Sequence, residues 1–243
     1  MNRAVNNKAS GFTIVELLLA MTFVAILLLV IAITVIQIGN MYNRGLTLRS
    51  VDQSGRVITA DIRRTINQSQ PFSLENNYLS QKNPDSELSE PDGGRLCTGT
   101  YTYVWNIGKA IAAGSPVNVY DNGEEEIRLA RVKDNGGVYC LLANATEPII
   151  KDDAVELLSG GDVNLAIQSL SIEEIPSTFN VGQALYRIVL EIGTNDQDAI
   201  NQDVTLNSID TSCKPPSDDD SNLDFCAVNK FDFTALAGSK GGL

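Results

Sequence analysis

Hydrophobic and polar residues follow two different patterns along the first 70 positions. Residues 12–38 contain a single charged side chain, Glu16, and no glycine or proline. As a helix rising about 1.5 Å per residue, this run would be about 40 Å long, enough to span a bilayer. Further along, apolar positions recur at helical steps of three, four or seven, which predicts an amphipathic helix. These positions are Leu48, Val51, Ile58, Ile62 and Thr65.

We therefore predict one helix from about Phe12 to Ser69. Its first half is apolar on all sides and suits an apolar environment, whereas its second half buries one face against a folded domain. Pro71 disfavours helical backbone at Gln70, which sets the end of the helix. Gly55 and two earlier glycines weaken the helix and permit a bend.

Beyond Pro71 the pattern changes from helical to extended. Residues 72–94 are polar and rich in Asn, Ser, Pro and Gly, which indicates a long surface loop. Segments rich in β-formers follow between turn residues: TYTYVWNI, VNVYD, EIRLARV, GVYCLLAN, LAIQSLSIEEI, ALYRIVLEIG and DVTLNSI. DNGG at 134–137 is typical of a hairpin turn. The prediction is an α+β fold, a long N-terminal helix packed on an antiparallel sheet of about five to seven strands. If the sheet divides, the acidic segment between Cys213 and Cys226 is the expected point.

We divide the chain into four segments: residues 1–11, the membrane-spanning helix 12–38, the amphipathic stalk 39–70 and the head 71–243. Their charges differ. Residues 1–11 carry Arg3 and Lys8 and no acid, which predicts that the N-terminus stays in the cytoplasm and the head is exported. The head carries 11 Lys and Arg against 27 Asp and Glu, a net charge of −16. We expect no nucleic-acid binding by such an acidic domain.

The stalk is the basic part of the chain. We interpret its five arginines as a solvated helix face or as salt-bridge partners, with DNA or anionic lipid as the alternative. These arginines are Arg44, Arg49, Arg56, Arg63 and Arg64.

The composition excludes several kinds of chemistry. There is no histidine, the commonest general base and metal ligand. The four cysteines form no CxxC pair, so a zinc or thioredoxin-type site is not expected. In an exported domain two disulfides are the default, with three possible connectivities. We favour Cys97–Cys140 and Cys213–Cys226, because each joins neighbours in sequence; the second would contribute about 3 kcal/mol by loop closure.

Glu16 is the anomaly of the apolar run, because a carboxylate in hydrocarbon is costly. A cleaved secretory signal would have an apolar core of about 7–15 residues, and this run is longer. A plain membrane anchor fits the length but gives no reason for Glu16. The segment KASGFTIVELLLA, residues 8–20, resembles the type IV pilin-like family of pilins, minor pilins and pseudopilins, since a basic residue, glycine, aromatic residue and glutamate follow in that order.

The resemblance implies how this end of the chain is processed. Residues 1–11 would be a cytoplasmic leader, cut after Gly11 by a prepilin peptidase that also methylates the new N-terminal amine of Phe12. The implied partners are the peptidase-methylase, an inner-membrane assembly platform, membrane lipid before assembly and other subunits through their N-terminal helices. In a filament core, Glu16 would meet the Phe12 amine of a neighbour and set the register, because an unpaired buried charge is penalised.

A second stretch favours a minor subunit. GRVITADIRRTI, residues 55–66, resembles the stalk of W-type minor pilins and J-type minor pseudopilins, where an aspartate and further arginine follow an arginine within one to two turns. Arg56, Asp61 and Arg63–Arg64 occupy these positions. The apolar run lacks the proline of many major pilins, and a mature chain of 232 residues, 11 fewer than the full 243, is long for a major subunit.

The head offers one candidate ligand site. Calcium takes six to eight oxygen ligands, and the acid clusters at 121–126, 151–153 and 217–224 supply carboxylates. The candidates for calcium are Asp218, Asp219, Asp220 and Asp224, although none has EF-hand spacing and a solvated loop is the simpler interpretation. No base stands beside a nucleophile, so we expect no enzyme and no other cofactor.

The sequence thus favours a structural subunit of a pilus or pseudopilus, moving from the cytoplasmic membrane into an extracellular filament or a periplasmic pseudopilus. The alternative is an uncleaved, single-pass membrane-anchored extracytoplasmic binding domain. The machine served, whether for twitching, adhesion, DNA uptake or secretion, does not follow from the residues.

Overall fold

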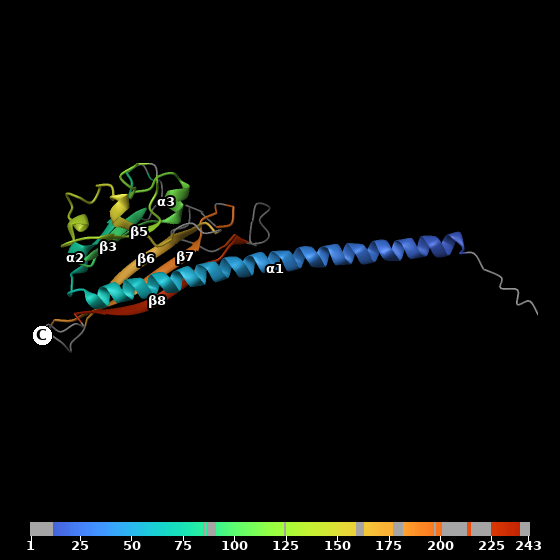
Figure 1. The fold of residues 1–243 in the computed structure, drawn as a ribbon, viewed down its shortest axis with the longest axis horizontal. Helices are drawn as coiled ribbons and strands as arrows, with labels where there is room; N and C mark the ends of the chain where they lie inside the picture. The colour runs from blue at the N-terminus through green and yellow to red at the C-terminus, as the bar shows by residue number, and fades with distance from the viewer. Residues whose placement is uncertain are drawn as a thin grey trace, which may run out of the picture. The chain divides into compact units, whose positions relative to one another are not determined.

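A long helix and two antiparallel sheets make up most of the structure, a computed structural model (Figure 1). It describes residues 12–84, 86, 91–123, 125–158, 163–176, 182–196, 198–200, 213–214 and 225–238. Contacts divide the chain into two units, residues 1–43 and residues 44–243. The fold class is α+β, as the sequence predicts.

The elements follow in a simple order after the first helix, α1 (Ile14–Gln68). One sheet has the order β1-β2-β3-β4-β5 and the other β6-β7-β8. The strands are β1 (Tyr78–Gln81), β2 (Gly93–Cys97), β3 (Tyr101–Asn106), β4 (Leu129–Lys133), β5 (Ala154–Glu156), β6 (Leu165–Ile175), β7 (Ala184–Thr194) and β8 (Val228–Ala237). The short helices are α2 (Leu74–Asn77), α3 (Gly108–Ala112), η1 (Val138–Cys140) and η2 (Lys151–Asp153).

The bounds of α1 agree with the predicted helix to within two residues. The helix ends where the Ser69 amide bonds to the Ile66 carbonyl at 3.0 Å, two residues before Pro71. The predicted stripe is also largely correct, because Val51, Ile58 and Ile62 are at most 2% exposed. Leu48 was wrongly included. Its side chain is 52% exposed, since that position lies just outside the buried face.

The core of unit 44–243 lies between the buried face of α1 and the two sheets. Val51, Ile58, Ile62 and Ile66 of α1 belong to one apolar cluster with residues of both sheets. From the three-stranded sheet come Tyr186, Ile188, Leu190, Ile192, Phe233 and Ala235, and from the other sheet Leu96, Tyr103, Trp105 and Leu129. Figure 1 shows the second half of α1 running along β6, β7 and β8. The stalk helix is therefore part of the head's core.

Strand predictions succeeded where β-formers alternate over a long run. β6 spans the whole of LAIQSLSIEEI, β7 adds one residue to ALYRIVLEIG, and β3 and β4 lie in predicted segments. The sheet divides between β5 and β6, not at the Cys213–Cys226 segment, because β7 and β8 on either side of that segment pair with each other. The segment DVTLNSI lies outside the described residues.

Four local predictions were wrong. GVYCLLAN contains η1 and turns, because Gly137 has a φ of +74° and Asp134 accepts the Val138 amide at 3.0 Å. DNGG consequently leads into η1 and forms no β-hairpin. VNVYD makes only isolated bridges at Val119 and Tyr120. The supposed loop 72–94 contains α2, β1 and the start of β2, and β8 went unrecognised although VNKFDFTALA alternates.

Gly55 allows the helix to approach the sheet closely. It is buried in an uninterrupted α1, and a Cβ at this position would lie 2.1 Å from the Cε2 and Cζ atoms of Phe231 on β8. The glycine is thus required by packing between α1 and β8, and the expected bend is not needed to explain it.

We predict that Gly55→Ala lowers the free energy of unfolding by about 1 kcal/mol, because overpacking costs about 1–3 kcal/mol and the gain in helix propensity is about 1 kcal/mol. Gly45→Ala is the matched control, since nothing lies within 4 Å of a Cβ there. It should leave stability unchanged or raise it. Urea denaturation of the full chain in detergent micelles, followed by emission of the single tryptophan, Trp105, would measure both. Equal stability of the two variants would contradict the packing argument.

Candidate functional site

The first candidate site is the surface of α1 in unit 1–43. The large apolar side chains of this stretch are at least 45% exposed, and the part of α1 that is long and apolar enough to cross a membrane contains no buried residue. An apolar surface of this extent needs lipid or protein around it. The chain therefore carries a helix that is a candidate to span a membrane, as expected. The residues are Phe12, Ile14, Val15, Leu17, Leu18, Leu19, Met21, Phe23, Val24, Ile26, Leu27, Leu28, Leu29, Val30, Ile31, Ile33, Val35, Ile36, Ile38, Met41 and Tyr42.

Glu16 and Thr13 form a reciprocal cap at the start of α1. The Glu16 amide bonds to Thr13 Oγ1 at 3.3 Å, and the Thr13 amide and hydroxyl both donate to Glu16 Oε2 at 2.9 Å. This is the capping box, in which residues three apart satisfy each other's free amides. The spacing Thr-x-x-Glu before an apolar run could have revealed it from the sequence. Glu16 thus has a local structural role in a single chain.

The other residues of the expected processing site are only partly described. Phe12 is 81% exposed and lies two residues before the start of α1. Gly11 and the leader 1–11 lie outside the described residues.

Both favoured disulfides are present in the head. Cys97 of β2 is bonded to Cys140 of η1, and Cys213 is bonded to Cys226, just before β8. Cys97 and Cys140 are 0% and 4% exposed; in the second disulfide Cys226 is 1% exposed and Cys213 is partly exposed, so Cys213 is the accessible sulfur. The first disulfide attaches the segment after β4 to the five-stranded sheet, and the second joins Cys213 to the residue two positions before β8.

Arg95 is a buried cation that no sequence pattern singles out. It is 1% exposed, and its guanidinium donates to Asn118 Oδ1 at 3.0 Å and to the carbonyls of Tyr139, Asn144 and Glu147 at 3.3, 3.1 and 2.8 Å. Burial lowers the pKa of Arg95 to about 10, so it remains charged at neutral pH. Together with Cys97–Cys140, this arginine fixes residues 139–147 onto β2.

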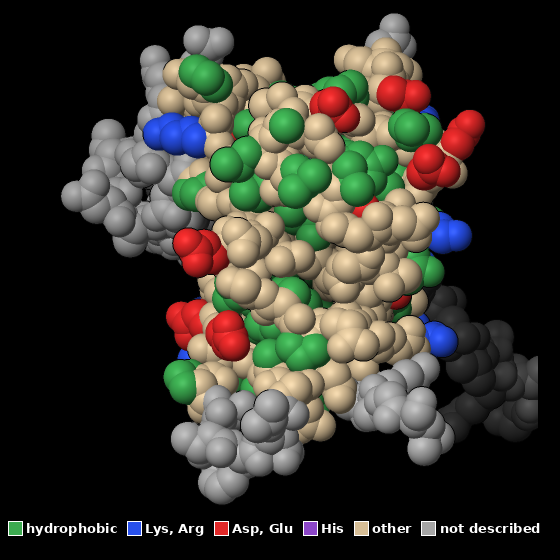
Figure 2. Space-filling view, turned by 90° about the vertical axis from the view of Figure 1, so that its left-hand side faces the viewer, with side chains coloured by type: hydrophobic (Ala, Val, Ile, Leu, Met, Phe, Trp, Pro, Cys, Tyr) green, Lys and Arg blue, Asp and Glu red, His purple; other side chains and the backbone are tan. Residues whose placement is uncertain are grey.

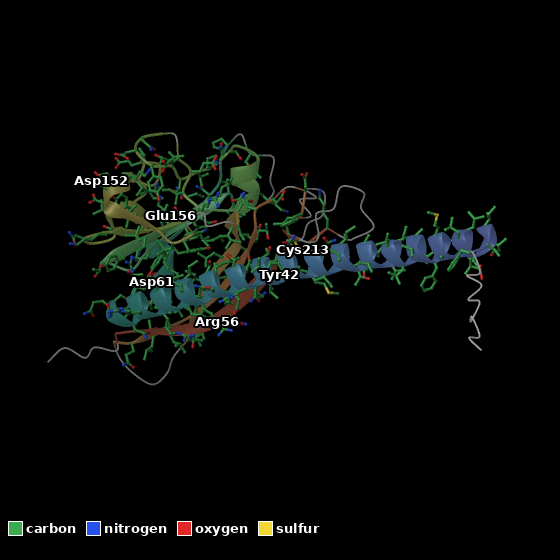
Figure 3. All side chains as sticks on the ribbon, turned by 45° about the vertical axis from the view of Figure 1, so that its right-hand side comes forward. Tyr42, Arg56, Asp61, Asp152, Glu156 and Cys213 are labelled. Atoms are coloured by element: carbon green, nitrogen blue, oxygen red, sulfur yellow. A yellow bond between two sulfur atoms is a disulfide. The ribbon has the colours of Figure 1, made fainter. Side chains whose placement is uncertain are left out.

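Asp61 faces the five-stranded sheet of the head. Its carboxylate accepts a bond from Tyr103 Oη on β3 at 2.8 Å and forms an ion pair with Arg131 on β4. Tyr103 is also bonded to Thr65 of α1, at 2.8 Å, and burial raises the pKa of its phenol, which keeps it neutral. Figure 3 shows Asp61 on the side of α1 that faces the sheets. This cluster ties the stalk helix to the five-stranded sheet.

The arginines of the same motif point elsewhere. Arg56 pairs with Asp52 one turn earlier, at 2.9 Å, and Arg63 donates to the Thr234 carbonyl at 3.2 Å. Arg44, Arg49, Arg56, Arg63 and Arg64 are all exposed, in agreement with a solvated helix face.

The head's acidic side chains do not assemble a metal site in the described part of the chain. No group of three or more Cys, Asp or Glu side chains there is close enough to hold a metal ion. The calcium candidates Asp218, Asp219, Asp220 and Asp224 lie outside that part. The clusters at 121–126 and 151–153 are described, apart from residue 124, and they contribute no such group.

Comparisons of the chain with family models, curated proteins and solved structures gave no match.

We predict that mild reduction without denaturant opens Cys213–Cys226 before Cys97–Cys140, because a thiolate must reach the sulfur that it attacks. Labelling with iodoacetamide followed by peptide mass analysis would identify the first cysteines to react. Earlier labelling of Cys97 or Cys140 would contradict the burial given above.

Proposed function

We propose that this protein is a structural subunit, of the minor type, of a type IV pilus or related pseudopilus. The observation that carries the proposal is the segment KASGFTIVELLLA at the start of a helix whose first half exposes apolar side chains on all sides. The second half of the same helix supports this, because its buried face belongs to the core of an α+β head. A helix of this kind links an apolar filament core to a folded outer domain.

Glu16 is the residue that would hold neighbouring subunits in register. Cleavage after Gly11 would expose the amine of Phe12, with a reference pKa of about 7.7–8.0 and hence a mostly positive charge at neutral pH. When helices from several copies pack in an apolar core, this amine can meet the Glu16 carboxylate of a neighbour. Subunits out of register would leave both charges unpaired in a medium of low dielectric constant, which is strongly penalised.

The proposed route begins in the cytoplasmic membrane. The basic residues before Phe12 keep the N-terminus inside, and the disulfides fit an oxidising compartment for the head. A prepilin peptidase-methylase, an assembly platform and other subunits are the partners that this route requires. The protein itself would carry out no catalysis.

An uncleaved membrane-anchored binding domain is the second candidate. The capping box favours it, because this arrangement gives Glu16 a role without any partner subunit. The two candidates differ in whether residues 1–11 are removed and in whether the charge of Glu16 matters.

For the protein made in its own host, we predict an intact mass that corresponds to a chain beginning at Phe12 with one added methyl group. The N-terminal peptide would locate the methyl group on the Phe12 nitrogen. A chain that still carries residues 1–11 would contradict the proposal and favour the anchored binding domain.

We also predict that Glu16→Gln reduces the amount of subunit in sheared filaments at least about tenfold, because it removes one charge of a pair that is buried in the filament. Glutamine at this position can still complete a capping box, so the variant separates charge from capping. Immunoblots of filament and membrane fractions would measure incorporation, with Glu16→Ala alongside. If Glu16→Gln assembles like the wild type while Glu16→Ala fails, capping is the function of this residue.

A further inference from the structure

A basic stripe runs along the exposed side of α1, and at its edge Arg63 also donates to the Thr234 carbonyl of β8 at 3.2 Å. We define it as Arg49, Arg56, Arg63 and Arg64, all exposed. The first three are seven residues apart and so lie on one line of the helix, roughly opposite the buried face. In the described part of the chain, Arg49 and Arg64 make no hydrogen bond or ion pair. Asp61 turns inward and Asp52 pairs with Arg56 at 2.9 Å, so the stripe keeps a net positive charge from the remaining arginines.

The head has an acidic face built from two loops. Residues 121–126 and 149–153 are held together by the bridge between Tyr120 and Ile149 and by the Lys151 amide, which donates to Asp121 Oδ1 at 3.2 Å. The exposed acids on these loops are Asp121, Glu125, Glu126, Asp152 and Asp153. Lys151 neutralises one of them by pairing with Glu125. The acidic face therefore keeps a negative charge.

A pocket opens within this acidic face. Its volume is about 340 Å³, and it is lined by Tyr120, Glu125, Glu126, Arg128, Lys151, Ala154 and Glu156. Glu156 is already occupied, since Tyr120 Oη and the amides of Arg128 and Leu129 donate to it. Glu126 has no hydrogen bond or ion pair within the described residues, and its carboxylate is left for an incoming cation. The pocket has room for the side chain of an arginine.

The basic stripe and the acidic face lie on opposite sides of unit 44–243. Figures 1 and 3 show α1 with Arg56 on one side of the sheets and η2 with Asp152 on the other. One subunit therefore cannot bring its own two surfaces together. Contact between two different surfaces of identical subunits generates a ring or an open helical array, the latter being the geometry of a filament.

We propose that the basic stripe of one copy docks on the acidic face of a second copy, with a stripe arginine entering the pocket. The inference rests on the proposed function and names a contact between subunits outside the apolar core. Charge complementarity supports this occupant, because the head carries a net charge of −16 from 27 acidic and 11 basic residues. Nucleic acid is disfavoured, since the whole chain, at −12, would repel phosphates.

The end of the head in Figure 2 shows acidic side chains spread among hydrophobic ones. Because acidic residues outnumber basic ones in the head, two copies repel each other at long range. A basic surface that meets an acidic one offsets this repulsion at close contact. The stripe would therefore set which faces meet as well as how strongly they bind.

The test exchanges charges between the two surfaces in the full chain. Arg49→Glu with Arg64→Glu reverses part of the stripe, and Glu126→Lys with Asp152→Lys reverses part of the acidic face. Each double variant should reduce incorporation into sheared filaments about tenfold or more, because like charges are then opposed. The quadruple variant should restore incorporation to within about twofold of the wild type. Lys82→Glu with Lys133→Glu is the control of equal charge change at exposed positions outside both surfaces, and it should assemble normally.

A second readout separates this inference from the proposed function. Chemical crosslinking of the full chain in detergent micelles at low salt should show self-association for the wild type and the quadruple variant, and little for either double variant. The measurement is made at low salt because high salt screens exposed charges. Wild-type incorporation of both double variants would overturn the docking contact while leaving the pilin-like function standing. Wild-type protein that is absent from filaments yet associates in micelles would overturn the pilin-like function alone. Two results together would overturn the inference and assign the stripe to nucleic acid. The quadruple variant would fail to recover incorporation into filaments, and the wild type would bind duplex DNA that the variant with Arg49→Glu and Arg64→Glu does not bind.

Discussion

The burial of one face of α1 between two sheets is the interaction on which the head depends. Val51, Ile58, Ile62 and Ile66 lie in the same apolar cluster as the inner faces of both sheets. Burying a side chain of this size contributes about 1.5–3 kcal/mol, so the loss of any one of the four would remove a large part of the small net stability of a folded domain. The head cannot be understood without the helix, and the helix beyond Arg44 would have no reason to be amphipathic without the head.

Polar contacts then fix how the helix sits against the head. Apolar packing is non-directional. The hydrogen bond and ion pair of Asp61 orient α1 relative to the five-stranded sheet, because they join the helix to both β3 and β4. Gly55 adds a steric constraint, since only a glycine lets Phe231 lie against the helix backbone. Arg95 plays a corresponding role within the five-stranded sheet, where its guanidinium binds the carbonyls of Tyr139, Asn144 and Glu147 to β2.

Glu16 shows how one residue can serve two states of a protein. In the single chain its carboxylate completes a capping box with Thr13. In the proposed filament, the same carboxylate would find the amine of a neighbouring Phe12. Both partners are hydrogen-bond donors at the start of a helix, and a helix N-terminus favours negative charge. A carboxylate that is already held at this point would lose little conformational freedom when a neighbour arrives.

The sequence alone determined the features that depend on local periodicity and on distance along the chain. These are the long helix, its apolar and amphipathic halves, the longest strands and the two disulfides between neighbouring cysteines. The structure decided the features that depend on which distant segments meet. The division of the sheet between β5 and β6, the close approach of β8 to Gly55 and the carbonyl bonds of Arg95 all join residues far apart in sequence. Periodicity reports which side of an element is buried, but it does not report the partner that covers it, because burial is non-directional and pairing is set by the whole fold.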